Sequence, residues 1–392
     1  RSKKPTCQLY SGHRGAGKTT ELLRLCETLK SEKFFVVYFA ADEEDIEPQD
    51  TTYADLLLAC TRHLVQGIRP KERDPILAWM GDRWQSLKGL AQTEIKFEGL
   101  NIEQQLNQFT KLTANLRAVP DIRAQLRQEI NTHTVSLVNA LNEFIDLAKK
   151  ELTDKRGIAI VADNLDRIAE VRDETHSNYD EIYLNRSEQL RGIGAHVIYT
   201  VPISLVYSHR GTRLEDIHGE ADVVPMIMVA NRDGSRNDKG MAKMRELVTK
   251  RLHKIDKKLA ENVDTQVFES EELLDCLCEM SGGHVRNLMQ MIQKAIDWTD
   301  TLPIREKAVK AAFGEARSTY RDTIEADQWT HLARVHKNKD ILNDDLHRWF
   351  QLSRCVLRYR YFDNDDILCE WYDVHPLVLG ISQFKKALEE VK

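Results

Sequence analysis

The sequence predicts an α/β fold: a parallel sheet with a helical insertion, followed by a helical C-terminal part. Between residues 6 and 67, short runs rich in β-branched and aromatic residues alternate with helical apolar patterns, which is typical of parallel-sheet proteins. A glycine-rich stretch separates the first run from the first helix. From about residue 240 the pattern is helical until two final strands. We expect a core at 1–235, a helical lid domain at 236–322 and a winged-helix-like domain at 323–392.

The glycine-rich stretch follows a short predicted strand, Thr6–Tyr10, and precedes a helical pattern at Glu21–Leu29. It fits G-x-x-x-x-G-K-[ST], the phosphate-binding P-loop, and consists of Gly12, His13, Arg14, Gly15, Ala16, Gly17, Lys18, Thr19 and Thr20. Glycines let successive backbone N–H groups turn toward one point, where they and a helix N-terminus hold phosphates. We expect Lys18 to reach the β- and γ-phosphate oxygens and the Thr19 hydroxyl to bind Mg²⁺. The core is thus predicted to be the parallel sheet of a P-loop NTPase.

The next elements continue the alternation and then interrupt it. Phe34–Ala40 is a continuous apolar run, as expected of a strand buried on both faces, and Thr51–Gly67 has a helical apolar stripe. Residues 70–152 contain no convincing strand, and we interpret them as a helical insertion. Two long helices are predicted there, Ile102–Ala118 and Asp121–Leu152, separated at a proline. The apolar stripe of the second favours a packing role over a partner-docking arm.

The third strand begins at Gly157 and ends at Asp163, the pattern of a Walker B segment. We expect the Asp163 carboxylate to hold the Mg²⁺ shell. Asn164 follows, at a position where many ATPases have a glutamate that activates water. Because an amide cannot take up a proton, hydrolysis should be slow unless Asp166 or a partner supplies the base.

Two further strands complete the predicted sheet. Ala195–Pro202 places Thr200 at its carboxyl end, where a hydroxyl could contact the γ-phosphate or the attacking water. Asp222–Val229 is the fifth strand, and its internal proline suits an edge. Arg210 and Arg213 lie between these strands. They could reach the phosphate of a neighbouring subunit, although a role as surface charges is favoured.

The C-terminal part is predicted to be helical before a final hairpin. Arg286 lies in the first turn of a predicted helix that follows a Gly-Gly turn. The predicted lid helices are Lys243–Leu259, Ser270–Met280, Val285–Trp298 and Arg305–Tyr320. The helices Ala326–Val335 and Ile341–Arg354 and the strands Val356–Phe362 and Ile367–Val374 suggest a winged helix.

Composition excludes several classes of protein. The chain has 392 residues and a net charge of −6. A net negative charge does not indicate nucleic-acid binding. No apolar run is long enough to span a membrane, and no secretory signal begins the sequence. The seven cysteines form no C-x-x-C pair, so we predict a cytoplasmic protein with reduced thiols. The first strand begins so early that we expect the chain to be part of a longer protein.

Together these motifs resemble the AAA+/STAND group of P-loop ATPases. The resemblance is carried by Gly12–Thr19, Asp163–Asp166, Thr200 and Gly282–Arg286, with the terminal winged helix. Within the group, the chain is similar to origin-recognition-complex-type ATPases and to the nucleotide-switch modules of NLR-like immune receptors. The resemblance implies that ATP or ADP is the nucleotide, and it gives Thr200 the role of sensor one.

Two further residues receive roles only from this resemblance. Arg286 matches sensor two, carried by the lid and contacting the γ-phosphate. His375 matches a winged-helix histidine that contacts the ADP β-phosphate in NLR-like receptors. Here Pro376 follows it, where those receptors have aspartate.

Three functions fit these observations. The first is a slowly hydrolysing ATP-dependent signalling switch or assembly ATPase, acting as a homo-oligomer or on an effector in trans or fused upstream; a bacterial antiviral system is the setting that the resemblance suggests. The second is a DNA-binding initiator or loader that uses its winged helix. The third is a scaffold whose nucleotide is structural. The DNA reading is supported by Arg354, Arg358, Arg360, Tyr359 and Tyr361 and opposed by Asp344, Asp345, Asp363, Asp365 and Asp366.

Overall fold

The computed structural model describes residues 4–68, 74–88, 104, 107, 120–172 and 177–391. Contacts divide the chain into two units. The first contains the chain up to Ser11 and Lys18–Val223, and the second contains Gly12–Gly17 and the chain from Val224 onward. Each unit is described by itself. No helix in the described ranges is both long and apolar enough to cross a membrane.

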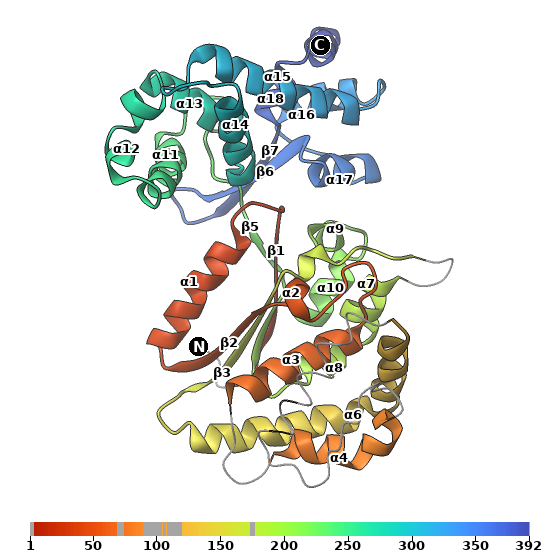
Figure 1. The fold of residues 1–392 in the computed structure, drawn as a ribbon. Coiled ribbons are helices and arrows are strands. Elements are labelled where there is room, and N and C mark those ends of the chain that lie inside the picture. Colours follow the sequence, from red (N-terminus) through yellow and green to blue (C-terminus); the bar gives the residue numbers. More distant parts are fainter. Residues whose placement is uncertain are drawn as a thin grey trace. The chain divides into compact units, whose positions relative to one another are not determined.

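The first unit alternates strands with helices (Figure 1). Its strands are β1 (Cys7–Gly12), β2 (Phe34–Ala40), β3 (Gly157–Asp163), β4 (His196–Thr200) and β5 (Asp222–Val224). Its longer helices are α1 (Lys18–Ser31), α3 (Tyr53–Gly67), α4 (Pro75–Lys88), α6 (Pro120–Glu151) and α10 (Gly211–His218). Its short helical turns are α2 (Ala41–Glu44), η1 (Leu165–Arg167), α7 (Asn178–Asp180), η2 (Glu181–Asn185), α8 (Ser187–Arg191) and α9 (Ile203–Val206).

The strands form one sheet in the order β2-β3-β4-β1-β5. The pairs β2–β3, β3–β4 and β4–β1 are parallel. The predicted α/β fold with a parallel sheet is therefore confirmed, and β2 has the predicted bounds. The predicted fifth strand was too long: β5 ends at Val224, because the next residue, Pro225, has no N–H for a ladder.

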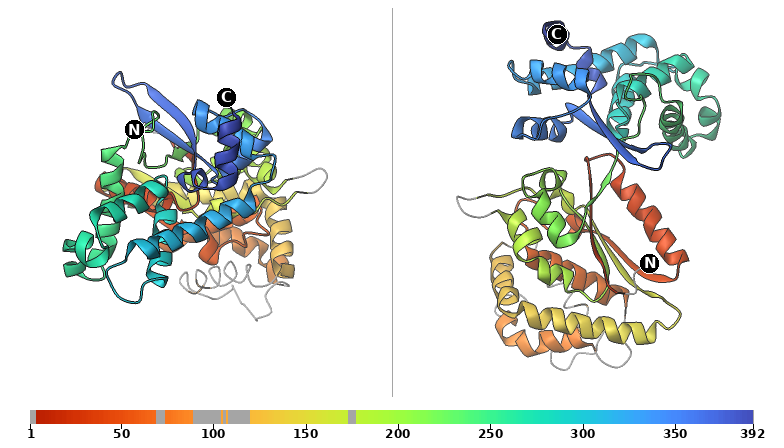
Figure 2. Two further views of the ribbon diagram at one scale, coloured as in Figure 1. Left: turned by 90° about the horizontal axis from the view of Figure 1, so that it is seen from above. Right: turned by 180° about the vertical axis from the view of Figure 1, so that it is seen from behind.

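Helices cover both faces of this sheet (Figure 2). On one face, Leu22 and Cys26 of α1 pack against Val161 of β3. On the other face, alternate residues such as Ile160 join a larger cluster that includes buried side chains of α3 and α6. This alternation follows from the period of two along a strand. It explains why the runs predicted as buried strands are apolar at nearly every position.

The helical insertion is confirmed in the part that the structure describes. Helix α6 begins at Pro120, where the sequence predicted a break, and it is kinked at His133. The predicted helix Ile102–Ala118 lies outside the described residues, apart from positions 104 and 107. Buried side chains of α4 and α6 belong to the same apolar cluster as the sheet, so these helices have a packing role.

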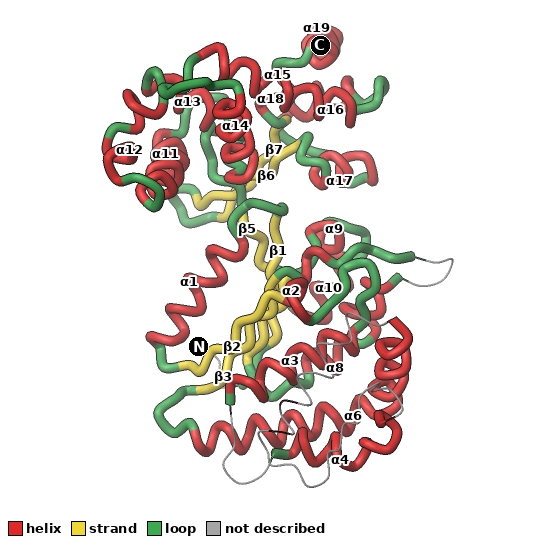
Figure 3. Tube along the Cα trace, viewed as in Figure 1, coloured by secondary structure: helices red, strands yellow, loops and turns green. Residues whose placement is uncertain are grey.

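The second unit is mainly helical and contains a β-hairpin (Figure 3). Its strands are β6 (Val356–Phe362) and β7 (Leu368–Val374), which pair antiparallel. Its helices are α11 (Asp238–His253), α12 (Lys257–Glu261), η3 (Val263–Val267), α13 (Glu271–Met280), α14 (Val285–Asp297), α15 (Glu306–Thr323), α16 (Trp329–Asn338), α17 (Asp345–Leu352), α18 (Pro376–Leu379) and α19 (Ser382–Glu390).

One apolar cluster connects most of the second unit. It extends from Val229 to Ala387 and includes residues of the predicted lid and of the predicted winged helix. Contacts group these two segments in one unit, with a boundary near Val224. The division at residues 235 and 322 into a core, a helical lid domain and a winged-helix-like domain stays a prediction. The single helix expected at Lys243–Leu259 is wrong, because α11 ends at His253 and α12 begins after the N-cap Asp256.

Candidate functional site

The carboxyl ends of three parallel strands meet at one edge of the sheet in the first unit. Strand β4 lies between β1 and β3. Tyr10 pairs with Thr200, and Ala162, which precedes Asp163, pairs with Tyr199. Asp163 and Thr200 therefore lie at neighbouring strand ends, at the edge of the sheet where open α/β proteins bind ligands.

Lys18 and Asp166 form a buried ion pair at this edge. The Lys18 Nζ lies 3.0 Å from Asp166 Oδ2, and the two side chains are only 7% and 9% exposed. Lys18 is the first residue of α1, and Asp166 lies in the 3-10 turn η1 that follows β3. The structure thus places two residues predicted to be catalytic in direct contact. The contact gives the lysine a carboxylate partner in this conformation.

Asp163 is fully buried and held on both carboxylate oxygens. The phenol of Tyr38 donates a hydrogen bond to Oδ2 at 3.0 Å, and the backbone N–H of Asn164 donates to Oδ1 at 2.7 Å. Burial and the neighbouring Asp163 charge raise the pKa of the Tyr38 phenol, so it remains a donor. This fixes the carboxylate at the strand end while leaving each oxygen further lone pairs.

Thr200 connects the ends of two strands. Its hydroxyl accepts a hydrogen bond from the backbone N–H of Leu165 at 2.8 Å and donates to the carbonyl of Ala162 at 3.4 Å. The side chain is fully buried. These bonds position the turn that contains Asp166. A contact from Thr200 to phosphate or water stays a prediction.

The identity of Asn164 has a backbone explanation. Its φ is 64°, in the left-handed region. Asparagine enters this region more readily than other non-glycine residues, and a glutamate would be more strained. The turn after β3 is therefore built with an amide where a proton acceptor is expected in many ATPases.

The P-loop glycines have the conformations that the motif requires. Gly15 and Gly17 have φ values of +96° and +105°, which disfavour any side chain. In the second unit, helix α14 packs on this loop: a Cβ at Gly15 would lie 2.4 Å from Cβ of Arg286. The backbone N–H of Arg286 donates to the carbonyl of Gly15 at 3.3 Å. Arg286 thus lies beside Gly15 within the second unit. A contact from its side chain to the γ-phosphate stays a prediction.

Two buried histidines hold this region together. Nδ1 of His284 caps α14 by accepting from the backbone N–H of Asn287, and its Nε2 lies 3.1 Å from the carbonyl of Arg14, to which it donates. Nδ1 of His375 caps α18 by accepting from the backbone N–H of Leu377. Its Nε2 lies 3.0 Å from the side-chain amide of Asn287. Both imidazoles therefore act as neutral N-caps.

Burial is the main reason that both histidines stay neutral. Burial and the nearby Arg354 lower the pKa of His284 to about 4. Burial, His284 and Arg354 lower the pKa of His375 to about 3. Because both ring nitrogens of His375 are engaged inside the unit, a contact with the ADP β-phosphate would require this network to open. That contact stays a prediction.

The residues at these positions suit a magnesium-bound nucleotide. Lys18 supplies an ammonium, and Thr19 and Asp163 supply the hard oxygen ligands that Mg²⁺ prefers. Among the described residues, no atom lies within 4 Å of the position that a Cβ on Gly17 would take, so the backbone there is open to a ligand. In the described ranges no three His, Cys, Asp or Glu side chains form a metal cluster. Mg²⁺ at a P-loop does not need one, since water and phosphate supply most ligands.

The two arginines considered for an intersubunit contact differ. Arg210 is only 8% exposed and forms ion pairs with Glu170 and Asp180, at 2.9 Å and 2.7 Å. Its interpretation as a surface charge is wrong, because its partners fix it inside the first unit. Arg213 is exposed and donates to the side chain of Asn185 at 3.1 Å.

Sequence reasoning missed Tyr38 and His284 as parts of this region. Tyr38 lies within an apolar strand, so its hydroxyl gave no signal, although its place near the strand's carboxyl end could have suggested one. His284 was interpreted only as part of a turn and helix start. Its partner Arg14 is 270 positions away in the sequence, which no local pattern reveals.

Comparisons with known proteins find only distant structural likeness. No family model and no curated protein matches the chain. The chain is similar to the ORC1 protein of Aeropyrum pernix in complex with DNA (TM-score 0.36, 12% identity, 99% of this chain and 87% of that chain). It is also similar to CDC6P of Pyrobaculum aerophilum (TM-score 0.36, 11% identity, 99% and 90%). Likeness at this level identifies no activity.

Proposed function

We propose that the chain binds ATP with Mg²⁺ at its P-loop and hydrolyses it slowly, as a nucleotide-dependent switch. The observation that carries this proposal is the buried ion pair of Lys18 and Asp166 at the start of α1. A buried ammonium that follows a glycine loop suits a polyanion, because it can exchange its carboxylate partner for phosphate oxygens. Slow turnover, ATP as the nucleotide and the switch are parts of the same proposal.

Each residue has a role that its surroundings support. Lys18 neutralises phosphate charge, and the Thr19 hydroxyl and Asp163 carboxylate hold the magnesium shell. Tyr38 fixes the orientation of the Asp163 carboxylate through its 3.0 Å hydrogen bond. Magnesium, when bound, would neutralise the charge that develops on the transferred phosphoryl group. Arg286, whose backbone bonds to Gly15, is the arginine expected to respond to the γ-phosphate.

The proposed slow turnover follows from the available bases. Asn164 cannot take up a proton, and Asp166 is engaged by Lys18. When phosphate draws Lys18 away, the Asp166 carboxylate becomes free to accept a proton from water. The same nucleotide that binds would therefore release the base, and turnover would depend on how completely the ion pair opens.

The first experiment identifies the nucleotide that purified protein carries. The protein is denatured and the released nucleotide is identified by chromatography. Stoichiometric ADP that survives gel filtration is expected for a closed, slowly exchanging switch, whereas an empty site with rapid ATP turnover would contradict slow switching. Lys18→Ala should abolish binding measured by calorimetry. Lys30→Ala changes an exposed lysine at the other end of α1 and should bind normally. Retained binding in Lys18→Ala would refute the P-loop site.

A second variant tests the base. Asp166→Asn should reduce turnover while nucleotide binding persists, since the amide keeps the shape of the side chain but cannot accept a proton. Asp163→Asn is the comparison, because it should weaken magnesium-dependent binding itself. Unchanged turnover in Asp166→Asn would assign the base to another residue or to a partner.

Partners belong to the proposal as well. We propose that the nucleotide state controls either assembly of the chain or its binding to an effector in trans.

A DNA-binding initiator remains the alternative function. Arg358, one of its supporting residues, forms an ion pair with Glu370, and Tyr359 is buried. Salt-dependent binding of duplex DNA would favour that alternative.

A further inference from the structure

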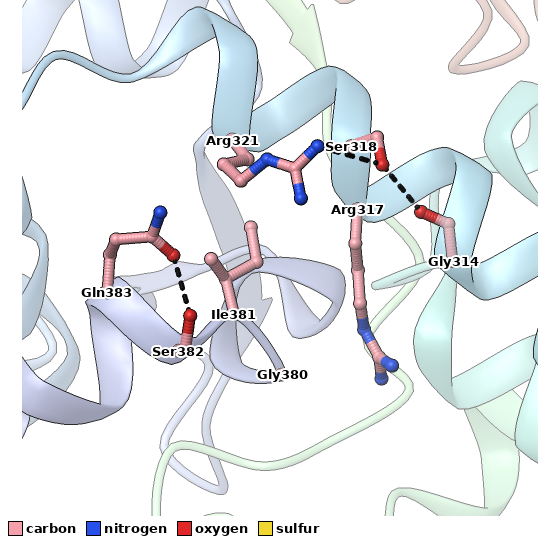
Figure 4. Close-up of a pocket in the computed structure, with 8 residues that line it drawn as sticks. All are labelled: Gly314, Arg317, Ser318, Arg321, Gly380, Ile381, Ser382 and Gln383. Carbon is pink, nitrogen blue, oxygen red and sulfur yellow. Dashed lines mark hydrogen bonds between the residues drawn. The ribbon is translucent and has the colours of Figure 1, made fainter.

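The second unit contains a cavity that the proposed nucleotide site does not use. Its volume is about 310 Å³. It lies between helix α15 and the segment where α18 leads into α19 (Figure 4). Arg317 and Arg321 come from α15, and Ser382 and Gln383 come from the first turn of α19. Ile381 provides an apolar wall.

The charged side chains that line the cavity are both positive. Arg317 and Arg321 are one helical turn apart, which places both guanidinium groups on one face of α15. None of the eight lining residues carries a carboxylate. Arg321 lies 3.4 Å from Asp322, and both of these side chains are more than half exposed. Its guanidinium also donates to the hydroxyl of Ser318 at 3.3 Å (Figure 4). Two neighbouring like charges without a carboxylate between them favour an anion.

The guanidinium of Arg317 has a buried nitrogen that lacks a hydrogen-bond acceptor among the described residues. This nitrogen is Nε. The Arg317 guanidinium lies 5.8 Å from the ring centroid of Phe313, a contact that gives the Nε–H no acceptor oxygen. An orphaned buried donor in the wall of a cavity is the feature that a bound acceptor would explain.

Gly380 leaves the space that this guanidinium occupies. A Cβ at Gly380 would lie 2.5 Å from Nε of Arg317 and 2.6 Å from Cζ. The φ of Gly380 is −81°, so the backbone does not require glycine there. The absence of a side chain is instead what gives the arginine room, and the arginine's position depends on it.

The start of α19 adds donors on the same side. Its N-cap residue, Ile381, provides no side-chain cap, and the first turn contains no acidic residue. The first N–H groups of a helix lack partners within the helix and form its positive end. The Ser382 hydroxyl points to Gln383, to which it donates at 2.9 Å.

We propose that this cavity binds a phosphate group, held by Arg317, Arg321 and the first turn of α19. Guanidinium groups match the geometry of phosphate oxygens, and helix N-termini bind the same group. The volume is at the lower end of small-molecule pockets, and Ile381 offers an apolar contact. A phosphate monoester with a small organic part is therefore the ligand class, and free phosphate shares its anionic chemistry.

The test uses the full chain with Lys18→Ala, so that the P-loop does not contribute. Phenyl phosphate and inorganic phosphate are titrated separately by calorimetry, and ³¹P NMR reports binding. We expect saturable binding at one site. Arg317→Ala and Arg321→Ala should each weaken it about tenfold or more, the effect of losing a hydrogen bond to a charged group. Tighter binding of phenyl phosphate would identify a monoester, and equal binding would identify free phosphate as the source.

Two matched variants distinguish a specific phosphate site from non-specific electrostatic attraction of phosphate to the helix. Gly380→Ala keeps every charge but displaces the Arg317 guanidinium, so it should weaken binding like Arg317→Ala. Lys307→Ala removes an exposed cation from the same helix, about 15 Å away along its axis, and should leave binding unchanged. Thermal unfolding confirms that each variant is folded. If Lys18→Ala does not fold, the wild-type background is used and the arginine dependence decides.

Three outcomes would overturn the proposal. The first is that neither phosphate probe binds saturably. The second is that binding persists in both arginine variants. The third is that a short DNA duplex binds through these arginines while neither phosphate probe does, which would assign the cavity to nucleic acid instead.

Discussion

The two units bury polar groups in different ways. In the first unit two buried pairs are charged: Lys18 with Asp166, and Arg62 with Asp45 at 2.7 Å. In the second unit the deepest polar network is neutral, with His284 and His375 as N-caps that meet at Asn287. An ion pair can exchange one member for a charged ligand. A neutral cap cannot, and it fails once it is protonated.

The largest expected effect is a pH dependence of the second unit. The pKa values of His284 and His375 lie below the ordinary 6.5, at about 4 and about 3. The unfolded state therefore takes up more protons than the folded state as the pH falls below 6.5. Stability is complete above pH 6.5 and falls toward pH 4, by up to about 1.4 kcal/mol per pH unit for each histidine. Urea unfolding from pH 7.5 to pH 4.5 measures this slope.

Variants of the two N-cap histidines test whether these residues cause the loss of stability at low pH. His284→Asn and His375→Asn should each reduce the pH dependence of the unfolding free energy by the contribution of one proton. The reason is that asparagine also caps helices but does not titrate in this pH range. His253→Asn changes an exposed histidine of the same unit and should leave the slope unchanged. An unaltered slope in both cap variants would mean that other groups control the acid sensitivity.

The second largest effect concerns the charged pair. Lys18→Met alone removes the ammonium that pairs with the buried Asp166 carboxylate, and Asp166→Asn alone removes the carboxylate that pairs with the buried Lys18. Each single change should cost about 3–5 kcal/mol of unfolding free energy without nucleotide, whereas the double change should cost much less. Denaturant unfolding of the four proteins gives the coupling energy. A coupling near zero would mean that water already solvates the pair, and the contrast between the units would disappear.

Local sequence patterns were sufficient for the sheet and the P-loop. A strand buried on both faces is apolar throughout, so Phe34–Ala40 could be located to the residue. The loop motif specifies its own glycines, and both Gly15 and Gly17 have the expected positive φ. The ends of elements were harder to predict. The end of β5 depended on Pro225, and the break after His253 has no strong local signal.

Contacts between distant residues could not be predicted. Arg210 was predicted to be a surface residue because its partners Glu170 and Asp180 lie at least 30 positions earlier in the chain. Helices α18 and α19 were not predicted; α18 has only four residues and begins at Pro376. The role of His375 in the structure, as a cap, is invisible in sequence because its partner Asn287 is 88 positions away.

A smaller effect should separate two glycines of the P-loop. Gly15→Ala and Gly17→Ala both force an L-residue to a positive φ. Only the first also places a Cβ 2.4 Å from Cβ of Arg286, whereas the second meets no atom within 4 Å in the part of the chain that the structure describes. Gly15→Ala should therefore be more destabilising by about 1–3 kcal/mol, the cost of overpacking. Equal unfolding free energies for the two variants would mean that α14 does not pack on the loop in solution.

The smallest expected effect tests a neutral contact of the hairpin. The phenol of Tyr359 donates to the carbonyl of Gly282 at 2.9 Å, and the ring stacks on Trp371 with centroids 4.4 Å apart. Tyr359→Phe keeps the stacking and removes only the hydrogen bond, so it should cost about 1 kcal/mol in urea unfolding. Tyr372→Phe is the control on the same hairpin. Its hydroxyl donates to Glu370 at a more exposed position, and its loss should change stability less. If the two variants lose equal stability, the buried Gly282 carbonyl has found another donor, and the neutral network of the second unit is more adaptable than its caps suggest.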